Sequence, residues 1–290
     1  MELASDFKKY LSSIEPTDKH VTAAKGAHET VREILRTDEE SKAAHKTSFL
    51  SGSYARSTAI KDINDVDVIW IIDMDPGITL PEVVLSWLQG ILSRHYKETR
   101  PQGRSVGANA AKDVWLDIVP ATIVSNDDGP LWIPDRDAKA WVQTHPRGQI
   151  NAEVEKNRIT NGYYVQVVKL LKAWKDRLPT ESSKPKSYIL ETLVHKTIGL
   201  PTSHAGAVVS VLEGIKTSYS AYSQLKVVPN ISDPGYSSVN VAKRWAVADF
   251  EAFMAQVDTA AVTARNALDT SDEATSRRLW RQLFGSDFGN

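Results

Sequence analysis

The chain has 290 residues, of which 41% are hydrophobic and 24% charged, the composition of an ordinary globular protein. It contains no cysteine, which excludes disulfides and thiolate zinc sites. A net charge of −1 and a pI near 6.7 provide no overall attraction for DNA or RNA. No apolar run approaches the ~20 residues of a membrane span, and the amphipathic N-terminus lacks a signal-peptide core, so we expect a cytoplasmic protein without membrane contact.

Two helices are predicted at the N-terminus, over residues 3–15 and 17–37. Each carries an apolar stripe at helical spacing, and Thr17-Asp18 offers an N-cap for the second helix. Residues 42–46 read as the end of a helix that leads into the first strand.

The chain from residue 49 to residue 73 predicts a strand, a turn, a short helix and a second strand. Gly52-Ser53 forms the turn, residues 54–60 fit the helix, and alternating apolar residues mark the strand 66–73. Asp65 and Asp67 lie at the start of this second strand and point to the same face, because side chains alternate along a strand.

Two carboxylates on one strand face repel each other and are costly to bury without a cation. A lone D-x-D is more often an exposed polar strand edge. Here it follows a Gly-Ser turn whose amides can hold phosphate, and this combination indicates Mg²⁺ and a nucleoside triphosphate.

A third carboxylate is found further along the chain. A helix over residues 80–98 is followed by paired strands at 105–106 and 114–124, joined by a turn at 109–112. Asp117 lies in the second of these strands between apolar neighbours, where an unpaired carboxylate is costly. Either an arginine pairs with Asp117, or Asp117 is the third ligand of a metal site. Asp113 is a weaker rival nearer the turn.

The rest of the chain is predicted to be mainly helical. Residues 125–150 are polar and read as a crossing loop. Helices are expected over residues 151–176, 187–199, 205–219 and 240–268, with a short one over EATSRRLWRQLFG at the end of the chain. Lys169 and Lys172 lie three residues apart on one side of the first of these helices. A pair of charges at this spacing usually marks only a solvent-exposed helix face.

The order Gly-Ser, D-x-D and a third Asp resembles the nucleotidyltransferase signature of the DNA polymerase β superfamily. GSYARSTAI followed by NDVDV and WLDIVPA is similar, more narrowly, to the CD-NTases, the cGAS/DncV-like enzymes of bacterial anti-phage (CBASS) signalling. The resemblance implies an α+β fold, in which a polymerase β-like nucleotidyltransferase lobe (a mixed twisted sheet with helices, residues 1–148) packs on a helical lobe (residues 149–290). It places the active site in the groove between the lobes.

The resemblance also assigns site residues. Asp65, Asp67 and Asp117 would be the catalytic metal ligands for two Mg²⁺ ions, with Mn²⁺ as an alternative. Nucleotide contacts would come from the following residues: Gly52, Ser53, Arg56, Lys169, Lys172, Ser187, Tyr188, Asp233 and Asn240. Three of these residues have an alternative role without nucleotide contact: Arg56 would face solvent, Asp233 would form an Asp-Pro turn, and Asn240 would cap a helix.

The function that the resemblance implies is the joining of NTPs (ATP, UTP, GTP or CTP) into a cyclic di- or trinucleotide that reaches a downstream effector. The compact length favours a dinucleotide. A transferase acting on an RNA end or a protein, and an idle nucleotide or RNA sensor, are the alternatives. The intact carboxylates argue against an idle sensor, and the charge does not indicate a nucleic-acid activator. The sequence leaves the base identities, linkage and ring size open.

Overall fold

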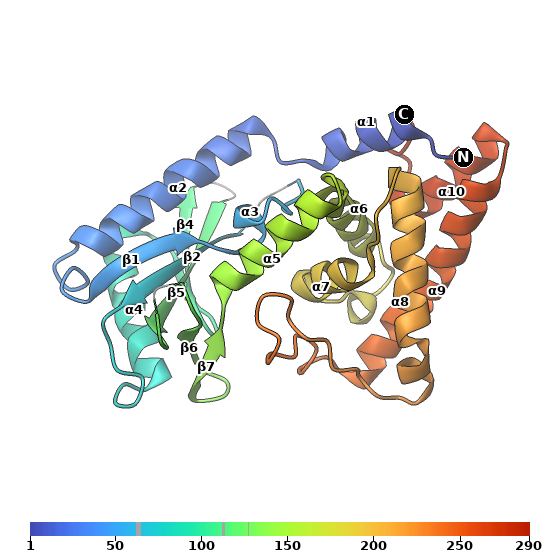
Figure 1. Cartoon of the computed structure of the whole chain (residues 1–290). Helices are drawn as coiled ribbons and strands as arrows, with labels where there is room; N and C mark the ends of the chain where they lie inside the picture. Colours follow the sequence, from blue (N-terminus) through green and yellow to red (C-terminus); the bar gives the residue numbers. More distant parts are fainter. Residues whose placement is uncertain (62–64, 112–113, 127) are drawn as a thin grey trace. The chain divides into compact units, whose positions relative to one another are not determined.

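The computed structural model describes residues 1–61, 65–111, 114–126 and 128–290, and the chain divides into two compact units (Figure 1). The sheet unit consists of Pro16–Asn151. The helical unit combines Met1–Glu15 with Ala152–Asn290. The observed division lies close to the expected one at 148/149, but residues 1–15 belong to the helical unit and not, as expected, to the catalytic lobe.

The sheet unit contains β1 to β7, all of the strands named in the described part of the chain. Its elements are α2 (Asp18–Thr37), β1 (His45–Leu50), α3 (Gly52–Ala55), β2 (Asp65–Ile72), α4 (Pro81–His95), β3 (Thr99–Pro101), β4 (Val106–Ala111), β5 (Val114–Ile123), β6 (Leu131–Asp135) and β7 (Ala140–Thr144). Helix α5 (Pro146–Ile159) runs across the boundary between the units.

The sheet is mixed, with strands in the order β1-β2-β5-β4-β3. β2 and β5 pair in parallel, and β1, β4 and β3 join them as antiparallel neighbours. The C-terminal part of β5 pairs with β6, and β6 pairs with β7. The expected α+β architecture with a mixed sheet is confirmed.

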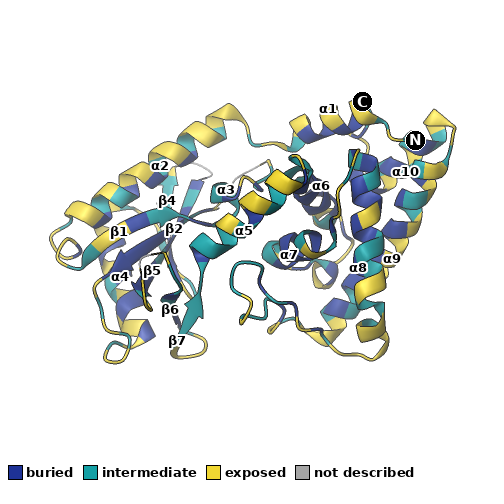
Figure 2. Cartoon of the chain, in the orientation of Figure 1, coloured by how far each residue is buried: buried dark blue, intermediate teal, exposed yellow. Residues whose placement is uncertain are grey.

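Alternation along β2 separates an apolar face from one that is polar at its start, where Asp65 and Asp67 lie, and apolar further along, where Ile69 and Ile71 are buried in a second core. Val66, Val68, Trp70 and Ile72 are buried in one core together with Leu116 and Ile118 of β5 and the apolar stripes of α2 and α4 (Figure 2). The even-numbered residues of β2 therefore face the helices. The odd-numbered Asp65 and Asp67 lie on the other face of the sheet.

The helical unit has its own core. Its elements are α1 (Ala4–Ile14), α6 (Tyr163–Asp176), the 3₁₀ turn η1 (Glu181–Ser183), α7 (Ser187–Thr197), α8 (His204–Gln224), α9 (Val247–Asp269) and α10 (Glu273–Phe284). No helix in the described part of the chain is long and apolar enough to cross a bilayer.

Aromatic packing explains why α1 belongs to the helical unit. The ring of Phe7 lies 5.0 Å from that of Trp280 and 4.9 Å from that of Phe288, both in edge-on geometry. Such pairs contribute ~0.5–1.5 kcal/mol each beyond burial of their area. Sequence periodicity showed that Phe7 is on a buried stripe, but it did not show which core the stripe joins.

The prediction that residues 125–150 form a loop was wrong. This segment contains the β6–β7 hairpin and the start of α5. Leu131 and Ile133 are buried in a small core beneath β5. The strands were missed because each has only five residues and β6 ends in Pro134-Asp135, which read as turn signals.

Other boundaries also differ from expectation. The helix predicted over 151–176 is two helices, because Asn161 (φ 52°) and Gly162 (φ 86°) adopt left-handed backbone conformations that end α5 and begin α6. Helix α9 begins at Val247, seven residues after the predicted start. Residues 42–46 are a turn and the start of β1, and the helix expected over 54–60 is the shorter α3.

Candidate active site

Three carboxylates, those of Asp65, Asp67 and Asp117, form a row on the face of the sheet that points away from α2 and α4. β2 and β5 are parallel neighbours, and their register places Asp67 opposite Asp117 and Asp65 opposite Trp115. Strand pairing thus brings together the three residues that the sequence selected. The rival, Asp113, lies outside the described residues.

Gly52 begins α3 directly against this row. Its φ of 66° is in the left-handed region, and a Cβ built on it would lie 1.7 Å from Oδ2 of Asp67. Ser51, the residue before it, donates its backbone N–H to the carbonyl oxygen of Asp67 at 2.9 Å. A residue without a side chain is therefore required where the Gly-Ser turn meets the carboxylate.

The electrostatics of the row favour a cation. Burial raises the pKa of Asp67 to about 6, and repulsion by Asp117 and Asp65 acts in the same direction, while Arg56 opposes it. Burial and Asp65 also raise the pKa of Asp117. The nearby positive charge does not offset burial and mutual repulsion, so ionisation of the row is unfavourable without further positive charge.

Two side chains that sequence reasoning missed contact the row. Arg100 donates from Nη2 to Oδ1 of Asp65 at 2.8 Å and lies 3.8 Å from Oδ1 of Asp117. Gln102 donates from Nε2 to the same Asp117 oxygen at 2.7 Å. The alternative of an arginine partner for Asp117 is thus also realised, but no sequence pattern identified Arg100, which lies on the three-residue strand β3.

The donors in this row suit a hard divalent cation, since Mg²⁺ prefers carboxylate oxygens. As the side chains stand, no three His, Asp or Glu groups among the described residues converge closely enough to hold one ion. Asp65 and Asp117 turn their Oδ1 atoms toward Arg100 and Gln102 instead. The chemistry of the donors and the raised pKa values of Asp67 and Asp117 fit a metal ion.

Ser53 and Arg56 belong to the same turn. Ser53 is partly exposed in α3, and its carbonyl oxygen accepts the backbone N–H of Thr58 at 3.0 Å. Arg56 is buried at 9% relative exposure and acts electrostatically on Asp67. Its expected alternative, a position facing solvent, is therefore wrong.

Lys172 is buried inside the helical unit. Its Nζ lies 2.6 Å from Oε1 of Glu191 on α7, and the two side chains are 5% and 0% exposed. The expected contact of Lys172 with a triphosphate does not fit this placement, because its charge is engaged in the protein interior. Lys169 forms an ion pair with Glu15 at 2.8 Å.

A different lysine on α6 accompanies the predicted serine. Lys175 donates from Nζ to Oγ of Ser187, the first residue of α7, at 2.9 Å. Tyr188 follows and is partly exposed. The sequence signal that could have identified Lys175 was its i, i+3 spacing from Lys172, which places both on one side of the helix.

Asp233 and Asn240 stabilise a loop. Oδ1 of Asp233 accepts the backbone N–H groups of Gly235 and Tyr236 at 2.8 and 3.1 Å. Oδ1 of Asn240 accepts those of Ile231 and Ala242 at 3.0 and 2.9 Å. Asp233 therefore forms the Asp-Pro turn that was expected as its structural alternative. Asn240 supports the loop backbone and does not cap α9.

Comparison with known protein families and sequences gives a uniform result. The family model of the Second Messenger Oligonucleotide or Dinucleotide Synthetase domain matches residues 1–157. A cyclic AMP-AMP-AMP synthase of an Acinetobacter strain is 34% identical over 301 residues, spanning 99% of this chain and 86% of that protein. A probable cyclic AMP-AMP-GMP nucleotide synthase of Salmonella paratyphi B is 30% identical, spanning 99% and 92%.

Solved structures show the same fold. The E. coli MS115-1 CdnC structure with ATP aligns over 99% of both chains with a TM-score of 0.79 at 18% identity. The Bradyrhizobium diazoefficiens CD-NTase CdnG in complex with GTP aligns over 97% of this chain and 95% of that chain, with a TM-score of 0.82 at 13% identity.

Proposed function

Because this chain belongs to the family of second messenger oligonucleotide or dinucleotide synthetases, the CD-NTases, we propose that it joins nucleoside triphosphates into a cyclic trinucleotide that contains adenosine, with release of pyrophosphate. The chain is a nucleotidyltransferase, as the members of this family are. The observation that carries the proposal is the pairing of Asp67 with Asp117 beside Gly52.

The ring size is proposed from the relatives. Those that match this chain at 34%, 30% and 29% identity are named as synthases of cyclic AMP-AMP-AMP or cyclic AMP-AMP-GMP, and each spans 99% of it. Compact length therefore does not favour a dinucleotide over a trinucleotide. ATP is the substrate that all of these names share.

The carboxylates prepare the reaction. Asp65, Asp67 and Asp117 would hold two Mg²⁺ ions, or Mn²⁺, which when bound lower the pKa of the attacking ribose hydroxyl and neutralise the departing pyrophosphate. Asp67 lies against Gly52, and burial raises its pKa to about 6, so its ionisation would depend strongly on the cation.

Each unit offers groups that would contact a nucleotide. Gly52 and Ser53 would offer backbone amides and a hydroxyl, and Arg56 would add positive charge beside them. On the helical unit we assign the phosphate contact to Lys175 in place of Lys172. Lys175 orients Ser187, and its ion pair with Asp176 at 3.2 Å lies nearer the surface than the pair of Lys172 with Glu191. Tyr188 would stack on a base.

The biological setting is proposed from the family. CD-NTases act in bacterial anti-phage defence, where the cyclic nucleotide activates an effector. We propose the same role here, in the cytoplasm, with the effector reached through the product and not by contact with this chain. Lys169, Asp233 and Asn240 are not assigned to nucleotide contacts in this proposal, because their polar groups serve local contacts.

The test is to incubate the purified protein with all four NTPs and Mg²⁺ and to identify phosphatase-resistant products by mass spectrometry. We expect a cyclic trinucleotide with at least two adenosines. Asp67→Asn should abolish it. Asp73→Asn is the matched control, because Asp73 lies just beyond the other end of β2. Its side chain is 73% exposed and forms a surface ion pair with Lys46.

Two results would overturn the proposal. A product that is linear or attached to a macromolecule would assign the chain to another class of nucleotidyltransferase. Full activity of Asp67→Asn would show that the carboxylate row is not the catalytic site.

A further inference from the structure

The side chain of Arg100 crosses a neighbouring strand to reach the carboxylate row. One line of register partners runs across the sheet, from Arg100 on β3 through Gly107 on β4 and Asp117 on β5 to Asp67 on β2. Along this line Arg100 is the cation that faces the carboxylates.

Gly107 provides the passage for this side chain. A Cβ built on Gly107 would lie 2.7 Å from Cγ and 2.8 Å from Nε of Arg100, and 3.1 Å from Oδ1 of Asp117. Any larger residue would force Arg100 away from its position above β4. The absence of a side chain at Gly107 is thus what allows the guanidinium to reach Asp65 and Asp117.

The guanidinium engages oxygens that a divalent cation requires. Its Nη2 lies 2.8 Å from Oδ1 of Asp65 and 3.8 Å from Oδ1 of Asp117. Mg²⁺ binds its oxygens at ~2.0–2.1 Å in a near-octahedral shell, which leaves no room for a guanidinium on the same atoms. A positive charge held at this distance also repels an arriving cation.

We infer that Arg100 competes with the catalytic divalent cation for Asp65 and Asp117 and must swing away when that cation binds. Arg100 thereby raises the metal concentration at which the enzyme becomes active. The inference rests on the proposed function, because it concerns the metal site of that reaction.

Arg100 is placed so that it can leave. Its side chain is 44% exposed, and its Cζ lies 4.2 Å from the ring centre of Trp115, so a cation–π contact can retain it after the ion pair breaks. Gln102 has a different role. It is neutral, its Oε1 accepts the hydroxyl of Ser105 at 3.2 Å, and its Nε2 orients Asp117 without adding a positive charge that would repel a cation.

Mn²⁺ titration tests this inference without turnover. The dissociation constant is measured by the EPR signal of free Mn²⁺, with no nucleotide present. Arg100→Gln should bind Mn²⁺ about fivefold more tightly, which corresponds to the loss of one partly exposed ion pair. Arg100→Lys keeps the charge but not the planar contact, and its affinity should lie between the two. The Mg²⁺ concentration for half-maximal activity should fall in the same order.

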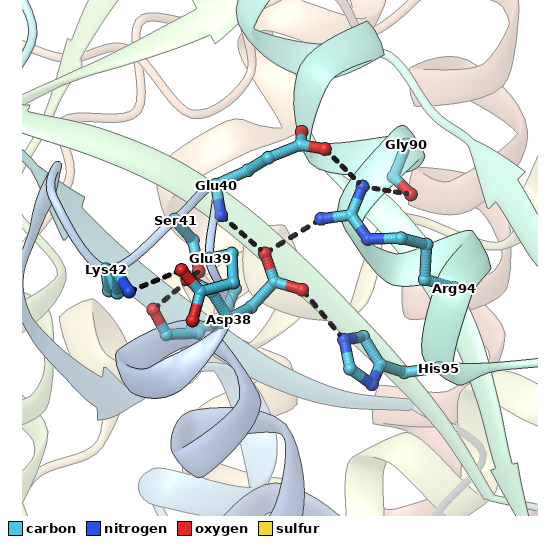
Figure 3. Close-up of polar contacts among 9 residues, drawn as sticks. Asp38, Glu39, Glu40, Ser41, Lys42, Gly90, Arg94 and His95 are labelled. Carbon is cyan, nitrogen blue, oxygen red and sulfur yellow. Dashed lines mark hydrogen bonds and ion pairs between the residues drawn. The ribbon is translucent and has the colours of Figure 1, made fainter.

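Arg94→Gln is the matched control. Arg94 is 41% exposed and pairs with Asp38 at 2.8 Å and with Glu40 at 2.8 Å (Figure 3). It lies in the same unit and loses the same charge, but it contacts none of the three carboxylates of the row. Its Mn²⁺ affinity should match that of the wild type.

Equal or weaker Mn²⁺ binding by Arg100→Gln, or an equal gain in Arg94→Gln, overturns the inference. If the wild type still makes the cyclic product in that case, the proposed function stands. If Arg100→Gln does not fold, as judged by circular dichroism, Arg100→Lys decides: wild-type affinity overturns the inference and tighter binding supports it. Failure of the wild type to bind Mn²⁺ or to make product would remove the proposed function itself.

Discussion

Replacing Lys172 by methionine separates a structural role from a role in triphosphate binding. Methionine keeps the unbranched apolar stem but removes the ammonium that lies 2.6 Å from Glu191. Glu191 would remain in the core of the helical unit at 0% exposure. The buried carboxylate then loses the cation that offsets the cost of its desolvation.

The expected cost follows from this burial. Removing one partner of a buried ion pair destabilises a protein by ~3–5 kcal/mol. For a folding unit of 150–250 residues, each kcal/mol lowers the Tm by ~2–4 °C, so a decrease of roughly 10 °C is expected. The double variant Lys172→Met/Glu191→Leu should recover most of this loss, because apolar residues of similar volume can replace a buried pair at little cost.

Calorimetry of the wild type, the single variant and the double variant measures these changes. Below the Tm of all three, we expect kcat/KM for ATP in the double variant to stay within about twofold of wild type, which is ~0.4 kcal/mol. The reason is that Lys172 and Glu191 pair with each other in the interior of the helical unit. An unchanged Tm in Lys172→Met together with a large loss of ATP binding would refute the structural role and restore the contact predicted from the sequence.

Further predictions concern the site itself. Gly52→Ala should lower kcat/KM at least ~100-fold with the fold retained in circular dichroism, because its Cβ would lie 1.7 Å from Oδ2 of Asp67; near-wild-type activity would contradict the geometry. In metal-free buffer, Asp67→Asn should be more stable than wild type above pH 6, by up to ~3 kcal/mol in free energy of unfolding. The reason is that the folded wild type, in which the pKa of Asp67 is raised to about 6, loses stability as the pH rises from 4 through 6 and this carboxyl ionises. In urea unfolding this difference should vanish below pH 4, and excess Mg²⁺ should reverse its sign. Lys175→Ala should raise the KM for ATP ~10-fold with little change in Tm, because it removes a charge-assisted phosphate contact; a KM equal to wild type would return the search to other cations.

The carboxylate row could be predicted from the sequence because strand periodicity and a short motif are local. Alternation placed Asp65 and Asp67 on one face, and the apolar neighbours of Asp117 marked a strand in which a carboxylate needs a partner. The parallel pairing that sets Asp67 opposite Asp117 is non-local, and the structure, not the sequence, shows it.

Arg100 and Gln102 could not be found in this way. They lie at a three-residue strand and the turn after it, and their contact with Asp65 and Asp117 depends on register across two further strands. Lys172 and Lys175 lie on the same side of α6, so the choice between them depends on which residues of α7 each one meets, and this requires the position of α7.

The helical unit shows the same limit. The periodicity of α1, α7, α8 and α10 predicted these helices, because each buries an apolar stripe. It did not assign α1 to a core, and it carried one helix through Asn161-Gly162, where only the backbone conformation reveals the break.

The central claim is that Asp65, Asp67 and Asp117 hold the catalytic metal ions. The most direct measurement is the anomalous scattering of Mn²⁺ in crystals grown with a non-hydrolysable ATP analogue. The account predicts Mn²⁺ peaks bounded by these three carboxylates, with Arg100 turned away from Asp65. Nucleotide bound with Mn²⁺ coordinated elsewhere, or with Arg100 still paired to Asp65 beside an ion on the same oxygen, would contradict it.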